Sequence, residues 1–335
     1  MPNKAYNCVL AVDIGGTNAR FGIIDANGEL IGEMNTLPVT LRADGVADEV
    51  ELVELIRHQL KQATQRVDLL PAVGISLCGN VDRATGEAVL VPNLHWRNVP
   101  FGRMIQERCG VEVQIATDVR QAALAEALWG AASGVRNFLW VTVGTGYGGY
   151  LFLNGRLYGG SHGFAGNFGH TPLDEVDGYM CGCGQRGCVE TFVAGPAIAR
   201  AGQLALAKEQ SQLLADLAAS NQDEVTAPMV FEAFEAGDKA AQRILERVIF
   251  LICQNLGAAV NLLDLDMIVL GGGVCNGSEW FVKRIDQRIR DFLETVEARR
   301  DLQVARESFV DSALWGAAAD VFAHRGIVGT SLLET

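Results

Sequence analysis

A strand, a glycine-rich turn, a second strand and an Asn-Gly pair are predicted to occur in this order twice in the chain. In the first copy, the apolar residues 8–13 and 21–25 flank the segment GGTNAR, and Asn27-Gly28 follows. An Asn-Gly pair after two short apolar runs is typical of a type I′ hairpin turn. The second copy consists of residues 138–143, the segment GTGYGG, residues 150–153 and Asn154-Gly155. The recurrence predicts two lobes of related topology, each presenting a glycine turn toward a shared cleft.

The remaining segments alternate between patterns typical of helices and of strands. Asp118 stands between a strand expected at residues 111–116 and an Ala/Leu-rich helix, where α/β proteins place cleft residues. Further helices are expected at residues 46–67, 196–217, 227–236, 238–262, 279–296 and 313–323, and further strands at 72–77 and 267–270. The alternation predicts an α/β fold with a smaller lobe, residues 1–117 plus about 313–335, and a larger lobe, residues 118–312.

The charge balance and the N-terminal segment exclude several classes of partner. The formal net charge of the 335 residues is -13, so a phosphate backbone or an anionic membrane surface would repel the chain. The segment MPNKAYNCVLAVDIGG lacks the pattern of a signal peptide, and no apolar run approaches the length of a membrane span. We therefore expect a cytoplasmic protein that binds neither nucleic acid nor membranes.

Three thiols lie within the ten residues of the segment CGCGQRGCVE, and a histidine precedes them. Cys181, Cys183 and Cys188 together with His170 provide the four ligands of a closed zinc site, and the glycines between them allow a tight loop. The alternative is a set of ordinary reduced cysteines in a glycine-rich loop. The other five cysteines are scattered without a pairing pattern: Cys8, Cys78, Cys109, Cys253 and Cys275. No disulfide framework is expected in a reducing compartment.

Three glycine-rich turns follow predicted strands, and backbone N–H groups in such turns can approach a phosphate closely. Asp13 precedes the first turn and could hold Mg²⁺, and Thr17 adds a hydroxyl group. The turns match neither the P-loop nor the dinucleotide-binding fingerprint, so each turn by itself fits a tight hairpin equally well. Together they favour a phosphate ligand. The turns contain Gly15 and Gly16; Gly144, Thr145 and Gly146; and Gly271 and Gly272.

Several of these motifs occur together in one known family. VDIGGTNARFGIID, VGTGYGG, GFAGNFGH, CGCGQRGCVE and IVLGGG resemble the ROK family of sugar kinases and sugar-responsive repressors. This family lies within the actin/hexokinase-like (ribonuclease H-like) ATPase superfamily, whose fold has two lobes with a cleft between them. The likeness extends from Cys8 to about Ala323, and the cysteine motif preceded by Gly-His is its most specific part.

The resemblance implies ATP and Mg²⁺ at the glycine turns and structural Zn²⁺ at the cysteine cluster. It implies that Asp118 accepts the proton of a sugar hydroxyl while the oxygen attacks the γ-phosphorus. A helix cap is the alternative role for Asp118, because Gln121 completes a capping-box pattern. The implied partners are a small-molecule sugar, ATP and a second copy of the chain. The implied sugar-binding residues are Gly79, Thr117, Asn167, His170 and Glu190, of which His170 also binds zinc.

Four positions depart from the usual pattern of the family, and we expect all four on the sugar side. Asn167 stands in place of a Glu, Thr117 and Arg120 each replace an Asn, and Cys78 replaces a Pro. A hydrogen bond to a charged carboxylate contributes about 1.5–3 kcal/mol. The exchange at Asn167 could therefore lower the affinity for a glucose-like ligand by roughly one to two orders of magnitude.

Four functions fit these observations. The first is an ATP-dependent kinase acting on the 6-hydroxyl of a hexose. The second is an N-acylhexosamine kinase such as an N-acetylmannosamine kinase, because Asn167 leaves room for an N-acyl group. The third is a sugar-sensing repressor, which needs a DNA-binding domain where only seven residues precede Cys8. The fourth is a sugar-binding protein that has lost catalytic activity, which the four sugar-side departures suggest.

Overall fold

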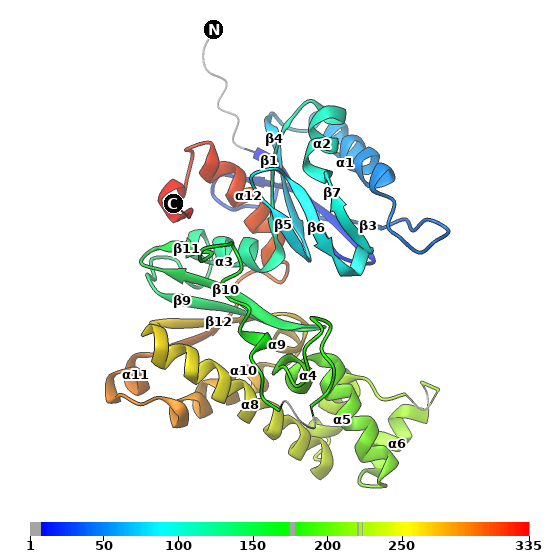
Figure 1. Ribbon diagram of the computed structural model, residues 1–335, viewed down its shortest axis with the longest axis vertical. Coiled ribbons are helices and arrows are strands. Elements are labelled where there is room, and N and C mark those ends of the chain that lie inside the picture. Colours follow the sequence, from blue (N-terminus) through cyan, green and yellow to red (C-terminus); the bar gives the residue numbers. More distant parts are fainter. Residues whose placement is uncertain (1–7, 175–177, 220, 223, 335) are drawn as a thin grey trace. The chain divides into compact units, whose positions relative to one another are not determined.

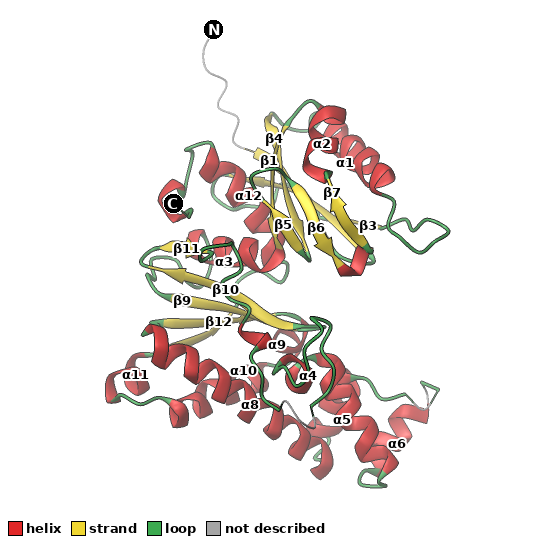
Figure 2. Ribbon diagram, in the orientation of Figure 1, coloured by secondary structure: helices red, strands yellow, loops and turns green. Residues whose placement is uncertain are grey.

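The computed structural model describes residues 8–174, 178–219, 221–222 and 224–334. They form two compact units, each with its own β-sheet and hydrophobic core (Figures 1 and 2). The first unit comprises residues up to 134, residues 155–157 and residues from 311 onward; the second comprises residues 135–154 and 158–310.

A five-stranded mixed sheet forms the centre of the first unit, in the order β3-β2-β1-β4-β8. Strands β1 and β2 form an antiparallel hairpin, whereas β4 runs parallel to both β1 and β8. The strands are β1 (Cys8–Ile14), β2 (Asn18–Asp25), β3 (Asn35–Pro38), β4 (Leu69–Leu77) and β8 (Glu112–Thr117). A separate three-stranded sheet contains β5 (Asn80–Asp82), β6 (Glu87–Val91) and β7 (Trp96–Val99). Because parallel strands end at the same edge of a sheet, the residues that follow β1, β4 and β8 are neighbours.

Side chains of β1 alternate between the two faces of this sheet. Leu10, Val12 and Ile14 belong to the core that α1 and α2 cover, whereas Val9 and Ala11 pack against α12. The helices are α1 (Glu49–Ala63), α2 (Phe101–Cys109) and α12 (Ser312–His324). Helices cover both faces, which explains why the central strands are almost wholly apolar.

Helix α12 approaches its neighbours so closely that two glycines are required. A β carbon on Gly74 of β4 would lie 1.9 Å from the carbonyl oxygen of Ala317, and one on Gly316 would lie 1.7 Å from that of Gln121. Gln121 belongs to α3 (Asp118–Leu128), so α3 packs tightly on α12. This packing places α3 in the first unit, which extends to residue 134, whereas the expected smaller lobe ended at residue 117.

A second five-stranded sheet, in the order β11-β10-β9-β12-β13, forms the centre of the second unit, although residues 156 and 157 of its edge strand β11 are assigned to the first unit. Its strands are β9 (Phe138–Val143), β10 (Tyr147–Leu153), β11 (Arg156–Tyr158), β12 (Met267–Gly271) and β13 (Gln303–Arg306). Its helices are α4 (Glu190–Val193), α5 (Gly195–Ala207), α6 (Gln212–Ala219), α7 (Ala227–Glu235), α8 (Lys239–Leu263), α9 (Gly273–Gly277), α10 (Glu279–Ile289) and α11 (Val296–Asp301). The apolar face of the sheet and these helices share one core.

Helix α8 is the long central helix of this core. By length and composition it is the one helix in the described part of the chain that could cross a membrane, and half of that stretch is buried inside the unit. Leu245, Ile249, Ile252 and Leu256 are fully buried within the core that also contains strand β9. This packing is that of the core helix of a globular domain.

The turn at Asn27-Gly28 differs from the expected type I′. Gly28 has a φ of +82°, but the backbone of Asn27 lies outside the left-handed region that a type I′ turn requires. The Asp25 carboxylate accepts a hydrogen bond from the backbone N–H of Asn27 at 2.9 Å, which stabilises another turn. The type I′ prediction is wrong there. The second copy has positive φ at both Asn154 (55°) and Gly155 (79°), as a type I′ turn requires.

Two predicted helices are each divided in the structure. The helix expected at 196–217 is split into α5 and α6, because Ser211 Oγ accepts from the backbone N–H of Leu214 at 2.9 Å and starts a new helix. The helix expected at 279–296 ends with α10 and a 3₁₀ turn, and Thr295 caps α11. Both prediction errors arose at polar side chains that begin helices.

Replacement of Gly316 by alanine tests the contact between α3 and α12. Alanine favours a helix by about 1 kcal/mol, but the new β carbon would meet a backbone carbonyl that can move only with its helix. We expect Gly316→Ala to lower the free energy of unfolding by about 2–3 kcal/mol in urea titrations. Gly277→Ala is the matched control, since a β carbon on this helical glycine meets no atom within 4 Å. Equal stability of the two variants would contradict the packing.

Candidate functional site

Asp13 lies near the end of β1, and two side chains hold its carboxylate. Ser76 Oγ donates to Oδ1 at 2.8 Å, and Arg20 Nη1 donates to Oδ2 at 3.3 Å. The strand register explains both contacts, because Asp13 pairs with Arg20 on β2 and with Ser76 on β4. Arg20 Nε also lies 3.4 Å from Asp311 Oδ1. Burial raises the pKa of the Asp13 carboxyl in spite of these partners.

The first glycine turn connects β1 to β2. The backbone N–H of Gly15 donates to the carbonyl oxygen of Asn18 at 3.0 Å, so the segment is a tight hairpin turn. A β carbon on Gly16 would lie 2.9 Å from Cβ of Asn93, which explains the need for glycine. Thr17 is exposed at the tip. A hairpin describes the backbone, and the phosphate-binding role of this turn stays a prediction.

Asp118 is the first residue of α3, but Thr117 is the residue that caps this helix. Thr117 Oγ1 accepts a hydrogen bond from the backbone N–H of Arg120 at 3.4 Å, as a helix cap does. Asp118 Oδ1 accepts only from the backbone N–H of the next residue, Val119, at 2.9 Å. The capping alternative for Asp118 therefore does not hold. Burial, and next the negative charge of Asp13, raise the pKa of the Asp118 carboxyl to about 6.

Cys78 and Gly79 follow β4 at the same sheet edge. Leu77 pairs with Thr117, so the next residues outward, Cys78 and Asp118, are neighbours. The Cys78 thiol hydrogen-bonds to the Asp118 carboxylate, whose negative charge raises the pKa of the thiol. Gly79 is needed because a β carbon would lie 2.6 Å from the carbonyl oxygen of Leu90.

Arg120 points into the first unit and is almost fully buried. Its Nη1 lies 3.2 Å from Asp320 Oδ1, and its Nη2 lies 3.1 Å from Glu334 Oε2 near the C-terminus. Gln121 Nε2 donates to the second Asp320 oxygen at 3.2 Å. Helix α3 thus directs Arg120 toward α12 and the C-terminal residues. The expectation that Arg120 lies with the sugar-side departures is wrong, because buried acidic partners hold its charge.

The four predicted zinc ligands lie together in the second unit. The ligand atoms of His170, Cys181, Cys183 and Cys188 all lie within 4.8 Å of one another. Cys181 Sγ is 3.5 Å from His170 Nδ1, and Cys183 Sγ is 3.6 Å from Cys188 Sγ. Tetrahedral zinc with ordinary bond lengths separates a sulfur from a nitrogen by about 3.6 Å and two sulfurs by about 3.8 Å. The donor set and its spacing therefore fit zinc.

Glu190 connects the cysteine cluster to the second glycine turn. Its Oε1 accepts from Cys181 Sγ at 3.3 Å, and its Oε2 accepts from the backbone N–H of Tyr147 at 2.9 Å. A β carbon on Gly146 would lie 2.9 Å from Oε2. His170 and Glu190 thus share Cys181 as a neighbour. A change in the cluster would move Glu190 as well.

Asn167 precedes the 3₁₀ turn that carries His170. Its side-chain Nδ2 donates to the backbone carbonyl oxygen of Phe164 at 3.0 Å. Its backbone carbonyl oxygen accepts from the backbone N–H of His170 at 3.0 Å. The side chain is otherwise exposed. Of the five residues expected to bind sugar, Asn167, His170 and Glu190 belong to the second unit and Gly79 and Thr117 to the first.

The second and third glycine turns lie side by side at the ends of β9 and β12. The parallel register pairs Thr142 with Gly271, and a β carbon on Gly144 would lie 3.6 Å from the backbone nitrogen of Gly273. Gly272 has a φ of +84°, and its N–H donates to Glu307 Oε1 at 3.1 Å. A β carbon on Gly272 would lie 2.4 Å from Thr142 Oγ1, so the close approach of the third turn to β9 requires glycine at this position.

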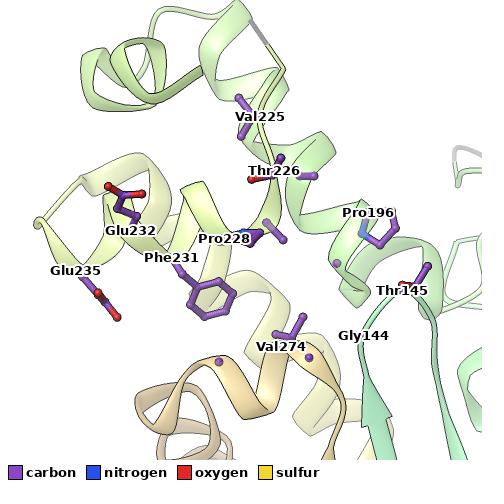
Figure 3. A pocket seen from close by; sticks show the side chains of 15 residues that line it. Gly144, Thr145, Pro196, Val225, Thr226, Pro228, Phe231, Glu232, Glu235 and Val274 are labelled. Carbon is purple, nitrogen blue, oxygen red and sulfur yellow. The ribbon is translucent and has the colours of Figure 1, made fainter. Parts of the chain in front are cut away.

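A cavity of about 710 Å³ opens beside these two turns (Figure 3). Phe231 and Val274 point toward each other on one side, and Thr145 and Pro196 form the other side. Glu232 and Glu235 stand at its margin. The walls are mainly apolar and the glycine turns supply bare backbone, which is how proteins bind flat ligands that carry phosphate.

A comparison with known sequences identifies the family. The sequence profile of the ROK family matches residues 9–323. The chain belongs to the ROK family. One solved structure similar to this chain is a ROK glucokinase from Streptomyces griseus in complex with glucose and AMPPNP. The two chains are 30% identical in sequence, and their structures match with a TM-score of 0.78 over 93% of this chain and 98% of the glucokinase. The predicted actin/hexokinase-like α/β fold is therefore confirmed.

Relatives of this ROK protein include enzymes and regulators. An N-acetylmannosamine kinase of Vibrio cholerae is 30% identical over 290 residues, 84% of this chain and 88% of the kinase. A xylose repressor of Caldicellulosiruptor bescii is 26% identical over 289 residues, 86% of this chain and 71% of the repressor. Family membership thus supports a sugar kinase and does not identify the sugar.

Several polar residues of these sites escaped prediction. Ser76, Arg20 and Asn93 surround the first turn, and Glu307 holds the third. Arg20 could have been found from the hairpin, since it stands opposite Asp13 once the turn is centred on the glycines. Glu307 had no signal, because a single carboxylate after the short strand β13 matches no ligand-binding motif.

Metal content tests the cysteine cluster of this ROK protein. We expect purified wild type to carry about one zinc per chain, because four well-spaced ligands close the coordination shell. Cys183→Ser should lower the zinc content and the midpoint of thermal unfolding, as measured by mass spectrometry of the metal and by circular dichroism. Cys109→Ser is the matched control outside the cluster. Full zinc content in Cys183→Ser would contradict the ligand set.

Proposed function

We propose that this ROK protein is an ATP-dependent sugar kinase that phosphorylates the 6-hydroxyl of a hexose. The single observation that carries the proposal is the state of Asp118. Its carboxyl group does not serve as a helix cap, and it lies at the sheet edge near Asp13. Its pKa is raised to about 6. A base of this kind is mostly ionised at neutral pH, yet basic enough to accept a proton as a hydroxyl begins to react.

The transfer needs one proton acceptor and a neutralised phosphate. The hydroxyl oxygen of the sugar forms a bond to the γ-phosphorus, the bond to the leaving ADP oxygen breaks, and the hydroxyl proton passes to Asp118. Cys78 and the backbone of Val119 hydrogen-bond to the carboxylate and keep it oriented. Positioning and electrostatics supply most of the acceleration in such reactions.

Asp13 fits a Mg²⁺ site, with the metal held directly or through water. Burial, and to a smaller extent the negative charge of Asp311, outweigh the hydrogen bond from Ser76 and the charge of Arg20, so the pKa of the Asp13 carboxyl stays raised. A nearby divalent cation would stabilise the Asp13 and Asp118 carboxylates in their ionised form. When bound, Mg²⁺ supplies charge neutralisation for the phosphates.

The nucleotide would occupy the cavity beside the second and third glycine turns. Its apolar walls around Phe231 and Val274 suit a purine, and the lining residues Gly144, Thr145 and Gly273 suit the ribose and phosphates. Gly271 and Gly272, expected at the nucleotide, lie just before Gly273 at the end of β12. The Streptomyces griseus relative was crystallised with AMPPNP and glucose, which supports both ligands for this chain.

Zinc would act here by orienting sugar-binding groups. Zinc would hold His170 directly, and it would hold Cys188, which lies two residues before Glu190, so the metal would fix the segments that carry both side chains. Four protein ligands leave no coordination position for a reacting water, which argues against a hydrolytic role.

An asparagine at position 118 tests the base. We expect Asp118→Asn to lower kcat about 10²–10⁴-fold while sugar affinity by calorimetry stays within about threefold. The wild-type kcat/KM should fall as the pH drops through about 6, because protonation removes the acceptor. Asp48→Asn is the matched control, since this residue caps α1 in the same unit and asparagine preserves a cap. Unchanged turnover in Asp118→Asn would exclude this role.

An N-acylhexosamine kinase is the second candidate, and Asn167 favours it. The amide can donate to an acyl oxygen, and the side chain is shorter than the Glu usual in the family. The Vibrio cholerae N-acetylmannosamine kinase, 30% identical, supports the same class.

The substitution Asn167→Glu separates the two kinase hypotheses. If Asn167 accommodates an N-acyl group, Glu should raise the KM for N-acetylmannosamine and lower that for glucose, each by roughly tenfold. Steady-state assays with glucose, allose, mannose, N-acetylglucosamine and N-acetylmannosamine measure both effects. Asn167→Gln, which is longer but neutral, is the control for size. An absence of ADP release with every sugar would favour a non-catalytic or regulatory protein.

A homodimer, a cytoplasmic location and the lack of a nucleic-acid partner remain part of the proposal. The excess of acidic residues, a formal net charge of -13, supports the last of these.

A further inference from the structure

A second cavity of the second unit gathers basic side chains in an acidic protein. It has a volume of about 390 Å³ and lies between α5 and α8. Four basic residues line it, and no acidic residue is among its lining in the described part of the chain: the four are Arg200, Lys208, Arg243 and Arg247. We call this the basic cavity.

Some arginines of the second unit have acidic partners, whereas the four cations of the basic cavity form no ion pair with the described residues. Glu246 holds Arg284 at 2.8 Å and Arg288 at 2.7 Å, and Asp286 holds Arg290 at 2.9 Å. Within residues 8–174, 178–219, 221–222 and 224–334, no ion pair involves the four basic residues of the cavity. Four like charges around one cavity repel each other, and an anion bound among them would relieve that repulsion.

Arg200 is held in place at the cavity by neighbouring groups. Its guanidinium lies 3.8 Å from the centre of the Tyr179 ring, and it donates to the carbonyl oxygen of Thr191. The ring of Phe192 lies 5.9 Å from that of Tyr179. An arginine fixed on an aromatic ring loses little conformational freedom when it binds an anion.

The other walls of the basic cavity are apolar. Leu204 on α5 and Ile244, Val248 and Leu251 on α8 complete the lining beside the two aromatic rings. A ligand that suits both parts has a doubly charged group for the cations and a ring for the apolar walls.

We propose that the basic cavity binds a phosphate monoester that carries a ring, as an effector site separate from the nucleotide cavity. The two cavities share no lining residue. The phosphate dianion contacts the arginines and lysine, and the ring packs against the aromatic and aliphatic side chains. Sugar phosphates and aromatic phosphates both belong to this class.

The basic cavity is connected to the cysteine cluster through the chain itself. Tyr179 lies two residues before Cys181, and Phe192 lies two residues after Glu190. The backbone N–H of Gly187 donates to the Tyr179 carbonyl oxygen at 2.8 Å within the same loop. An anion that orders Tyr179 and Phe192 therefore also orders the segment from 178 to 192.

Calorimetric titration with phenyl phosphate tests the site in the full-length protein. AMPPNP and Mg²⁺ are present in excess to fill the nucleotide cavity, and ionic strength is held constant. We expect the variant Arg243→Ala/Arg247→Ala to bind about tenfold more weakly than wild type, because two cations are removed from a dianion. Arg136→Ala, which removes an exposed arginine at the far end of β9, should bind like wild type.

Inorganic phosphate and glucose 6-phosphate are the further probes. Inorganic phosphate should bind about tenfold more weakly than phenyl phosphate, since it gains nothing from the apolar walls. Equal affinity for the two would overturn the ring-bearing class and assign the site to free phosphate. Binding of glucose 6-phosphate at least as tight as that of phenyl phosphate would identify a sugar phosphate as the source of the anion.

Hydrogen exchange provides a readout that does not depend on kinase activity. Amides within residues 178–192 should exchange more slowly with phenyl phosphate bound in wild type, and at unchanged rates in Arg243→Ala/Arg247→Ala. No heat of binding with any probe, or equal affinity of wild type and the double variant, would overturn the proposal. Binding without protection of 178–192 would overturn the effector role.

Discussion

The parallel register of β1, β4 and β8 determines where every candidate catalytic group of the first unit lies. It pairs Asp13 with Ser76, and Leu77 with Thr117, so that Cys78 and Asp118 leave the sheet as neighbours. A shift by one residue would turn these side chains to the opposite face of the sheet. The register is maintained in turn by the alternation of Val9 and Ala11 against Leu10 and Val12, and by the close contact of α12. The chemistry of this unit therefore depends on apolar packing far more than on its polar residues.

In the second unit, the corresponding constraint is the loop that carries the cysteines. Three sulfurs and one imidazole nitrogen lie within 4.8 Å of one another, and the Glu190 carboxylate accepts a hydrogen bond from the Cys181 thiol. The same carboxylate touches the backbone at Tyr147, beside the second glycine turn. One acidic side chain thus links the cysteine cluster to the second glycine turn. Two residues proposed to bind sugar, His170 and Glu190, and the turn proposed to bind phosphate therefore lie in one connected set of contacts.

Sequence patterns predicted most of the strands and helices, because their apolar periodicity reflects burial on one or two faces. They predicted the cysteine cluster because its ligands are close in sequence. They failed where a polar side chain decides between two local structures: Asp25 selects another turn at Asn27, and Thr117 caps α3 in place of Asp118. They also misplaced Arg120, which was expected on the sugar side. Its partners, Asp320 and Glu334, are distant in sequence, and only the packing of α12 on α3 brings them near.

The buried charge of Arg120 depends on a residue near the C-terminus of the chain. Glu334 is the second acidic partner of this arginine, and Arg83 contacts the same carboxylate. Removal of one partner from a buried ion pair costs about 3–5 kcal/mol, because it leaves a charge without compensation. A change at Glu334, more than two hundred residues along the chain, would therefore reach the helix that begins with Asp118 through the guanidinium of Arg120.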